Sequence, residues 1–317
     1  MRRMTLRLGL WLLLGCTAPN EAFRPDPQAA PDGMLPLPDV AVDQAPARCV
    51  GRPAWPPGTT TRTLASGGRM RSYLLRVPQG YDPSRPAPLL FLFHGFGSSA
   101  AAILTYSAIG THADRVGLVV VAPEGVFASW NAGRCCGIAQ QQGIDDVGLV
   151  RDLLGVLGAE LCLDGSRIFA AGHSNGGFLA HRLACELSEH IVGIAPVAAS
   201  LNITPCTPAR PVSVLHVHAR DDRIVPYEGG GLTGTEGAVQ SFTGWAQRSG
   251  CTGMPVETYS KGRASCQGYL TCRQGTAVVL CTTEDGGHDW PGPASRGSRD
   301  IDASAEMVQF LIAHPRP

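Results

Sequence analysis

The chain has 317 residues with 26 basic and 26 acidic side chains, so its formal net charge is zero. A neutral chain offers no basic surface for nucleic acid, and 44% apolar residues suffice for a sizeable core, which argues against a disordered protein. Eleven cysteines are typical of an oxidising compartment rather than the cytosol.

The N-terminal residues have the pattern of an export signal. Three arginines precede a short apolar run at 8–14, which is too short to span a bilayer. The run ends in Leu-Leu-Gly-Cys, similar to a bacterial lipobox, so we expect residues 1–16 to be an export signal and Cys16 to carry a lipid. A plain signal peptide cleaved nearby is the alternative. Both interpretations predict an extracellular or cell-envelope protein, and both leave ten cysteines in the mature domain.

Residues 17–48 are rich in Pro and Ala and show neither a helical nor a strand period. Such composition predicts an extended, disordered tether. Residues 49–317 then form one folded domain. No other apolar stretch in the sequence is long enough to span a membrane, so membrane contact is expected only through a lipid on Cys16.

Short apolar runs alternate with helical patterns along this domain. Runs of consecutive apolar residues suit strands that are buried on both faces. Strands are expected at 71–77, 89–93, 118–122, 168–171, 191–199, 212–217 and 276–283. Helices are expected after Asp145 and Asp146, over 178–185 and 239–245, and after Asp302. This order predicts an α/β protein with a mostly parallel central sheet and helices on both faces.

The sequence Gly172-His173-Ser174-Asn175-Gly176 is a G-x-S-x-G motif between an expected strand and an expected helix. A nucleophile on such a tight turn needs glycine on both sides, because the flanking backbone is crowded. The turn also places Ser174 at a helix N-terminus, which favours developing negative charge. Ser174 is therefore the candidate nucleophile, and an ordinary glycine-rich turn is the alternative.

A nucleophilic serine needs a base, and the base needs an orienting acid; in this arrangement their chain order is serine, acid, base. His288 is the candidate base because it lies in a glycine-rich loop after the strand expected at 276–283. Asp221 and Asp222 follow the strand at 212–217 as candidate acids, and the residues alone do not separate them. The histidines in less suitable positions are His190, His216, His218 and His314.

Acyl transfer also requires backbone N–H groups that stabilise an oxyanion. The residue after the nucleophile, Asn175, supplies one. The other is expected from Phe96, within His94-Gly95-Phe96-Gly97 at the end of the strand 89–93. A simple glycine-rich turn is the alternative for that segment.

Seven segments in order, HGFG, PEG, WNAGRCCG, DDVG, GHSNGG, DDRIVPY and GGHDWPG, resemble the secreted polyhydroxybutyrate depolymerase and feruloyl esterase group of α/β-hydrolases over residues 60–315. The resemblance implies an α/β-hydrolase fold and a serine esterase that forms an acyl-enzyme and needs no metal or cofactor. It places the acid at Asp222, so the implied triad is Ser174, Asp222 and His288, with oxyanion donors at Phe96 and Asn175.

The implied substrates are polyhydroxybutyrate-type oligoesters or feruloyl and acetyl esters of plant polysaccharide. Polymer depolymerases of the group often carry a separate binding domain after the catalytic one. The sequence ends at Pro317 without it, which favours soluble or short esters. Trp130 and Trp290 are candidates to line the substrate cleft, with loop packing as the alternative.

Four cysteines near His288, at 251, 266, 272 and 281, are expected to pair among themselves and brace its loop. The adjacent Cys135 and Cys136 are expected to bond to distant partners.

No metal site is expected, because the His216-x-His218 pair lacks a third ligand. The expected assembly is a monomer. Two alternatives are a non-catalytic surface lipoprotein that binds polyester or carbohydrate, and a peptidase on the same fold, which would need a lid.

Overall fold

The computed structural model describes residues 49, 51–231 and 234–317. The predicted export signal, the lipid site at Cys16 and the tether at 17–48 lie outside the described residues.

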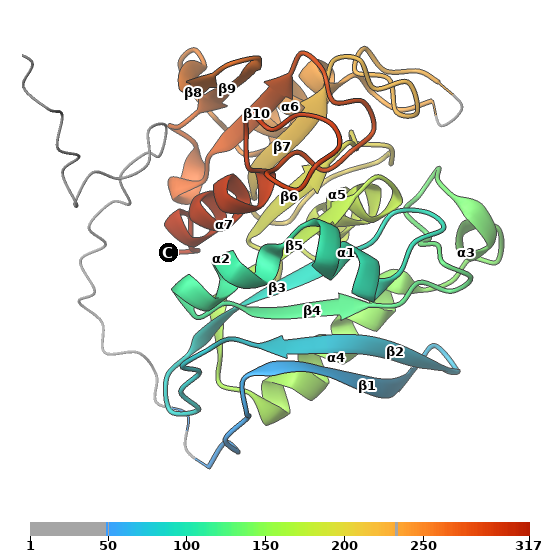
Figure 1. The fold of residues 1–317 in the computed structure, drawn as a ribbon, viewed down its shortest axis with the longest axis vertical. Coiled ribbons are helices and arrows are strands. Elements are labelled where there is room, and N and C mark those ends of the chain that lie inside the picture. The colour runs from blue at the N-terminus through green and yellow to red at the C-terminus, as the bar shows by residue number, and fades with distance from the viewer. Residues whose placement is uncertain (1–48, 50, 232–233) are drawn as a thin grey trace, which may run out of the picture. The chain divides into compact units, whose positions relative to one another are not determined.

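The centre of the domain is a ten-stranded sheet in the order β1-β2-β4-β3-β5-β6-β7-β10-β9-β8 (Figure 1). The neighbouring strands β4, β3, β5, β6, β7 and β10 are parallel, while β1 and β2 at one edge and β9 and β8 at the other are antiparallel. The strands are β1 Gly58–Ser66, β2 Arg69–Val77, β3 Ala87–Phe93, β4 Val119–Pro123, β5 Leu163–His173, β6 Gly193–Val197, β7 Ser213–Ala219, β8 Val256–Lys261, β9 Ala264–Tyr269 and β10 Val278–Thr283. The predicted mostly parallel sheet is confirmed.

Helices cover both faces of this sheet (Figure 1). In β3, Leu89 and Phe91 pack in the core that contains α4, α5 and α6, whereas Leu90 and Leu92 pack in the core that contains α1, α2 and α7. A strand buried on both faces needs consecutive apolar residues, which explains the LLFLF run. The helices are α1 Ala100–Tyr106, α2 Ile109–Val116, α3 Gly137–Gln141, α4 Asp146–Glu160, α5 Asn175–Glu186, α6 Ala238–Arg248 and α7 Ala303–Ala313, with a 3₁₀ turn at Arg273–Gly275.

Side-chain caps begin two of the predicted helices. The Asp145 carboxylate accepts a hydrogen bond from Gly148 N at 2.7 Å, at the start of α4. Asp302 accepts hydrogen bonds from the N–H groups of Ser304 and Ala305, at the start of α7. Both caps satisfy N–H groups that lack partners inside the helix.

Five disulfides join the ten cysteines of the domain: Cys49–Cys162, Cys135–Cys136, Cys185–Cys206, Cys251–Cys272 and Cys266–Cys281. The four cysteines before His288 do pair among themselves, as predicted. The expectation of distant partners for Cys135 and Cys136 is wrong, because these two cysteines bond to each other and the other eight are already paired.

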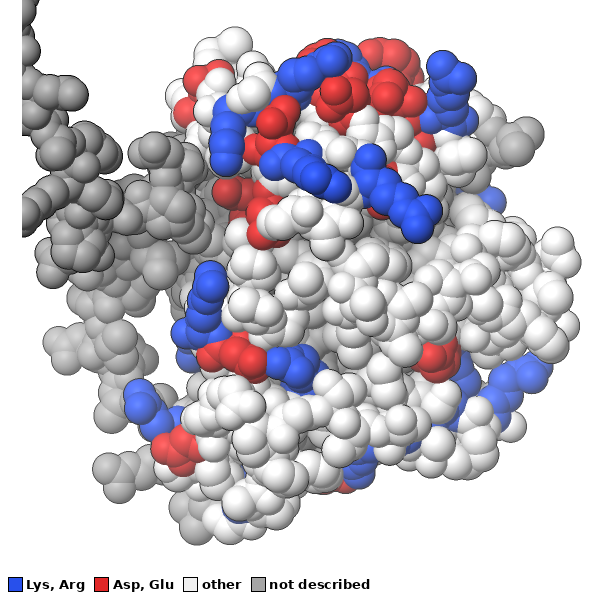
Figure 2. Space-filling model, viewed as in Figure 1, with Lys and Arg blue, Asp and Glu red and all other residues white. Residues whose placement is uncertain are grey.

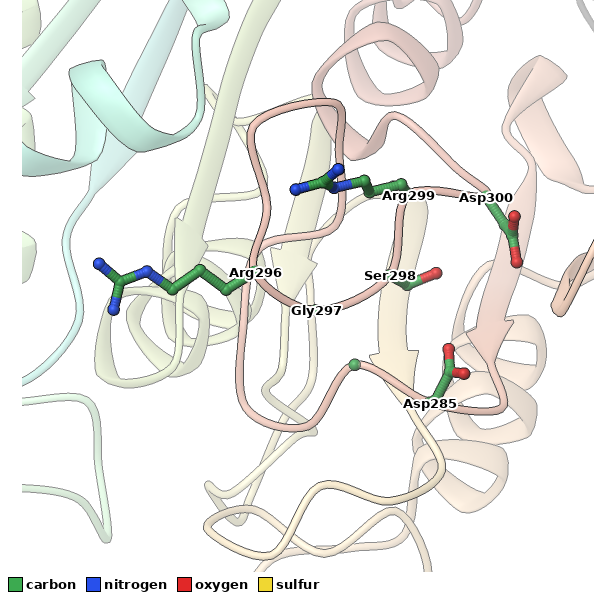
Figure 3. Close-up of a pocket in the computed structure, with 7 residues that line it drawn as sticks. Asp285, Arg296, Gly297, Ser298, Arg299 and Asp300 are labelled. Carbon is green, nitrogen blue, oxygen red and sulfur yellow. The ribbon is translucent and has the colours of Figure 1, made fainter.

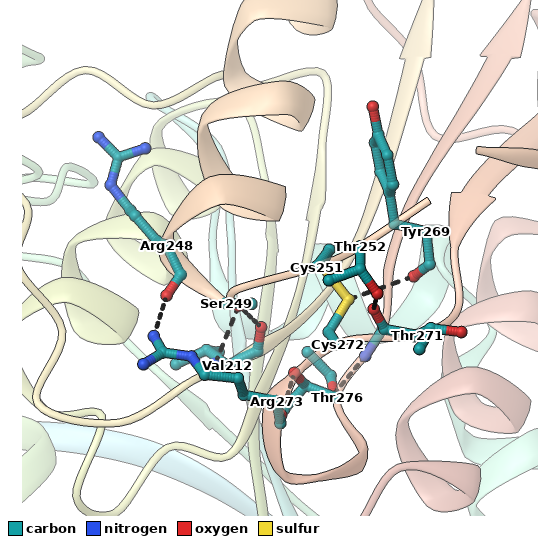
Figure 4. The surroundings of a disulfide bond; sticks show 12 residues. Val212, Arg248, Ser249, Cys251, Thr252, Tyr269, Thr271, Cys272, Arg273 and Thr276 are labelled. Carbon is teal, nitrogen blue, oxygen red and sulfur yellow. Dashed lines mark hydrogen bonds between the residues drawn. A yellow bond between two sulfur atoms is a disulfide. The ribbon is translucent and has the colours of Figure 1, made fainter. Parts of the chain in front are cut away.

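The Cys251–Cys272 bond ties the end of α6 to the turn before β10 (Figure 4). Next to it, Thr252 N donates to Thr271 O at 2.9 Å, and Arg273 N donates to Ser249 O at 3.0 Å. Cys266 and Cys281 face each other in the β9–β10 pairing.

Within the described ranges, no helix is both long and apolar enough to cross a membrane.

Candidate active site

Ser174 lies on the turn between β5 and α5, in a strained backbone conformation with φ 53° and ψ −118°. The flanking glycines are sterically required. A Cβ on Gly176 would lie 2.1 Å from the carbonyl oxygen of Phe93, and a Cβ on Gly172 would lie 2.4 Å from the backbone carbon of Gly176. The turn is held by Ser174 N, which donates to Val197 O at 2.9 Å. This geometry projects the serine from the carboxyl edge of the sheet.

Asp222 and His288 meet on neighbouring loops after the adjacent parallel strands β7 and β10. His288 Nδ1 lies 2.8 Å from Asp222 Oδ2. The other carboxylate oxygen of Asp222 accepts hydrogen bonds from Ile224 N and Val225 N, both at 2.9 Å. Asp221 is directed elsewhere, and its carboxylate accepts a hydrogen bond from Gly287 N at 2.8 Å. Of the two aspartates that the residues alone left open, the one next to the imidazole is therefore Asp222.

Asp222 is almost completely buried, with 4% of its surface exposed. Burial alone would raise its pKa, but hydrogen bonds from His218, His288 and Val225 N outweigh burial and hold the pKa of Asp222 well below its usual range. An ionised carboxylate at this position accepts a hydrogen bond from the Nδ1–H group of His288. The Nε2 atom of the imidazole is then the atom available to act as a base.

Three further buried histidines lie behind the Asp222 loop. His218 Nε2 is 2.8 Å from Val225 O, which can only accept, so this nitrogen is the donor. His218 Nδ1 then accepts from His216 Nε2 at 3.1 Å. Burial lowers the pKa of His216 well below its usual value, and it lowers that of His181 to about 3. These contacts hold the loop after β7, so His216 and His218 have a structural role.

An aromatic group packs beside His288. The ring centroid of His173 lies 5.0 Å from that of His288, 5.8 Å from that of Tyr106 and 6.4 Å from that of Trp290. Burial lowers the pKa of His173 to about 3, so this ring stays neutral next to the candidate base. The sequence does not predict Tyr106 at this position. It lies at the end of the short helix α1 and belongs to none of the motifs that mark the site.

The two candidate cleft tryptophans differ in surroundings. Trp290 is 3% exposed, donates from Nε1 to Ser304 Oγ at 3.0 Å, and borders a cavity of about 150 Å³ together with Tyr106 and Pro293. Trp130 is fully buried beneath the site. The expectation that Trp130 lines an open cleft is wrong, because its ring packs at 5.3 Å from Phe93 and has no free surface.

The segment that contains Phe96 lies against the nucleophile. A Cβ on Gly95 would be 3.5 Å from Ser174 Cβ, so the chain approaches the serine closely at Gly95. Among the described residues, the backbone N–H groups of Phe96 and Asn175 have no hydrogen-bond acceptor. Unpaired N–H groups next to a serine are what an oxyanion hole requires.

A second hollow, of about 550 Å³, lies between the residues just before His288, at 285–286, and the segment 296–300 (Figure 3). The carboxylates of Asp285 and Asp300 lie on one side of this part of the chain, and the guanidinium groups of Arg296 and Arg299 are directed to the other. Asp285 already pairs with Arg263 at 3.1 Å. Within the part of the chain that the structure describes, no cluster of three or more His, Cys, Asp or Glu side chains is arranged to hold a metal ion.

The parallel sheet, the turn at Ser174 and the loops after β7 and β10 define an α/β-hydrolase fold. The solved structure of native sOPH has this fold, with a TM-score of 0.55 and 16% identity over 86% of this chain and 91% of that one. The family model described as esterase PHB depolymerase matches residues 71–226. This match and the relatives below confirm that the chain resembles the polyhydroxybutyrate depolymerase and feruloyl esterase group.

Two curated relatives are similar to this chain. Feruloyl esterase B of Piromyces equi is 32% identical over 234 residues, which are 69% of this chain and 42% of the fungal protein. The chain therefore spans less than half of that relative. NocK of Nocardia uniformis subsp. tsuyamanensis, which is named as an esterase, is 28% identical over 98% of both chains.

Proposed function

We propose that this protein is a serine carboxylic-ester hydrolase. The observation that carries the proposal is the 2.8 Å contact between His288 Nδ1 and the buried carboxylate of Asp222, on the sheet edge that also presents the strained Ser174. A fully buried carboxylate that orients an imidazole beside a nucleophilic turn suits acyl transfer.

In this mechanism Ser174 Oγ attacks the ester carbonyl, and His288 Nε2 takes the hydroxyl proton. Asp222 keeps the other ring proton on Nδ1 and stabilises the imidazolium. The N–H groups of Phe96 and Asn175 stabilise the tetrahedral oxyanion, and one such donor typically contributes about 3 kcal/mol. His288 then protonates the leaving alcohol. Water, activated by the same imidazole, hydrolyses the acyl-enzyme and restores the serine.

The substrates we propose are hydroxybutyrate-type oligoesters or feruloyl and acetyl esters of plant polysaccharide. The names of the family model and of the Piromyces relative support the hydroxybutyrate and feruloyl esters in this range. Figure 2 shows that charged side chains of both signs gather near the upper end of one face, with smaller groups at its left and lower parts. The formal net charge of zero suits an ester without obligatory charge.

We also propose that the protein is exported. Five disulfides in one domain support this, because such bonds persist in oxidising compartments and are rare in the cytosol.

The test is covalent labelling of Ser174 by a fluorophosphonate probe, together with turnover of methyl ferulate, acetylated xylan, hydroxybutyrate oligomers and short p-nitrophenyl esters. The variant Ser174→Ala should lose both labelling and turnover of every ester while its thermal unfolding stays cooperative. Exposed Ser84→Ala is the matched control and should keep both. Turnover that survives in Ser174→Ala would contradict the mechanism. A native protein that neither labels nor turns over esters would favour the binding-protein alternative.

A further inference from the structure

The peptide unit between Gly95 and Phe96 is held from the side of its carbonyl group. His94 Nδ1 lies 2.8 Å from Gly95 O, and Ser98 N donates to the same oxygen at 3.1 Å. The carbonyl of Gly95 and the N–H of Phe96 belong to one planar trans peptide, so they point in opposite directions. A side chain that fixes the carbonyl therefore also fixes the direction of the Phe96 N–H.

The tautomer of His94 follows from its second contact. Gly125 N donates to His94 Nε2 at 3.0 Å, and a backbone N–H can only donate. The ring proton must therefore be on Nδ1, where it is donated to Gly95 O. Burial lowers the pKa of His94, which favours this neutral form.

Trp130 joins the same segment to the other oxyanion donor. Its indole Nε1 donates to His94 O at 2.9 Å, while its backbone N–H donates to the side-chain oxygen of Asn175 at 2.7 Å. The side-chain nitrogen of Asn175 donates back to Trp130 O at 3.1 Å. One buried residue thus fixes the position of both chain segments that supply the N–H groups.

We propose that His94 is a positioning residue. Its Nδ1–H fixes the Gly95 carbonyl and so directs the Phe96 N–H toward the oxyanion. Trp130 links the backbone of His94 to Asn175. The inference rests on the proposed function. Its physical basis is that oxyanion donors act only when they are preorganised, and small misplacements reduce the rate steeply.

Two substitutions of His94 by amides of similar size distinguish a loss of the hydrogen bond to Gly95 O from a loss of packing. In His94→Asn, the side-chain nitrogen occupies the place of Nδ1 and keeps the donor to Gly95 O. In His94→Gln, an oxygen at the place of Nε2 keeps the acceptor for Gly125 N, but the donor to Gly95 O is lost. Both remove part of a buried ring, so both should lower the melting temperature by similar amounts.

We expect kcat on a short p-nitrophenyl ester to fall less than about threefold in His94→Asn and about 10- to 100-fold in His94→Gln, with KM nearly unchanged in both. The affinity for a phenylboronic acid, which forms a tetrahedral anion on serine, should fall in parallel with kcat. Equal losses of kcat in the two variants, in proportion to their loss of stability, would overturn the inference while leaving the esterase proposal intact.

A third variant keeps the test decisive if the His94 variants fold poorly. Trp130→Phe removes the Nε1–H that holds His94 O and retains an aromatic ring. It should lower kcat and boronate affinity together by several-fold, again without a matching change in KM. Unchanged kcat and boronate affinity in a folded Trp130→Phe would refute the coupling. If wild-type protein shows neither turnover nor labelling of Ser174, the proposed function fails and this inference fails with it.

Discussion

At the scale of single residues, two adjacent aspartates have different roles because their carboxylates point to different partners. Asp222 is buried and contacts His288, whereas Asp221 caps the backbone of Gly287. The first contact orients a ring nitrogen, and the second only holds a loop.

This difference predicts the effects of two conservative substitutions. Asp222→Asn should lower kcat by roughly 10⁴, because a neutral amide no longer fixes the useful tautomer of His288. Asp221→Asn keeps an acceptor for Gly287 N and should lower kcat by less than about tenfold. Steady-state kinetics on one p-nitrophenyl ester measures both. The reverse order of effects would mean that the acid is Asp221.

The sequence identified the candidate residues of the site but not all of their surroundings. Ser174 and His288 were recognisable because their motifs follow strands, and parallel strands bring such loops to one edge. Choosing Asp222 required the family resemblance, since both aspartates follow the same strand. Trp130 was misjudged because the sequence around a loop tryptophan does not reveal which way its ring points.

At the scale of elements, continuous apolar runs identified the strands buried on both faces. The edge strands β1 and β8 lacked that signal, because most of their residues are exposed and polar. The short helix α1 was also missed, since only Ala100 and Ile103 of its residues are buried. Elements with little buried surface leave little pattern in a sequence.

The helix α7 predicts a pH effect on stability. Burial, with a contribution from Asp302 one turn away, raises the pKa of Glu306 to about 7. The folded state therefore holds a proton that the unfolded state releases near pH 4.5. The contribution of this proton to the free energy of unfolding is fully present below pH 4.5. It is lost as the pH rises through about 7.

Replacement of Glu306 by Gln should therefore raise stability at pH 8 by about 1 kcal/mol, allowing for partial exposure of the side chain, and change it little at pH 4. Urea unfolding at the two pH values measures the difference. Exposed Glu257→Gln removes the same charge and serves as the control. A gain at pH 4 equal to that at pH 8 would show that ionisation of Glu306 is not the cause.

At the scale of the whole molecule, one disulfide joins segments that lie far apart in the sequence. Cys49–Cys162 closes a loop of 113 residues and attaches the start of the domain to the segment between α4 and β5. A cross-link over such a distance removes much conformational freedom from the unfolded chain.

The double variant Cys49→Ala/Cys162→Ala should lose about 3–5 kcal/mol of unfolding free energy while retaining kcat, because neither cysteine contacts the site. Guanidinium unfolding of oxidised protein measures the loss. Cys185→Ala/Cys206→Ala, which opens a loop of only 21 residues, should lose less. An equal or larger loss in that variant would contradict the explanation by loop length.

The order in which cysteines leave the ribosome or translocon adds a consequence for production of the protein. Cys251 pairs with Cys272, and Cys266 pairs with Cys281, so the two bonds cross in sequence. As the chain emerges, Cys251 meets Cys266 before its native partner is present. Rapid oxidation then favours a bond that must later be reshuffled by thiol–disulfide exchange. Yield should therefore depend on disulfide isomerase activity in the producing compartment, more than on its oxidising power.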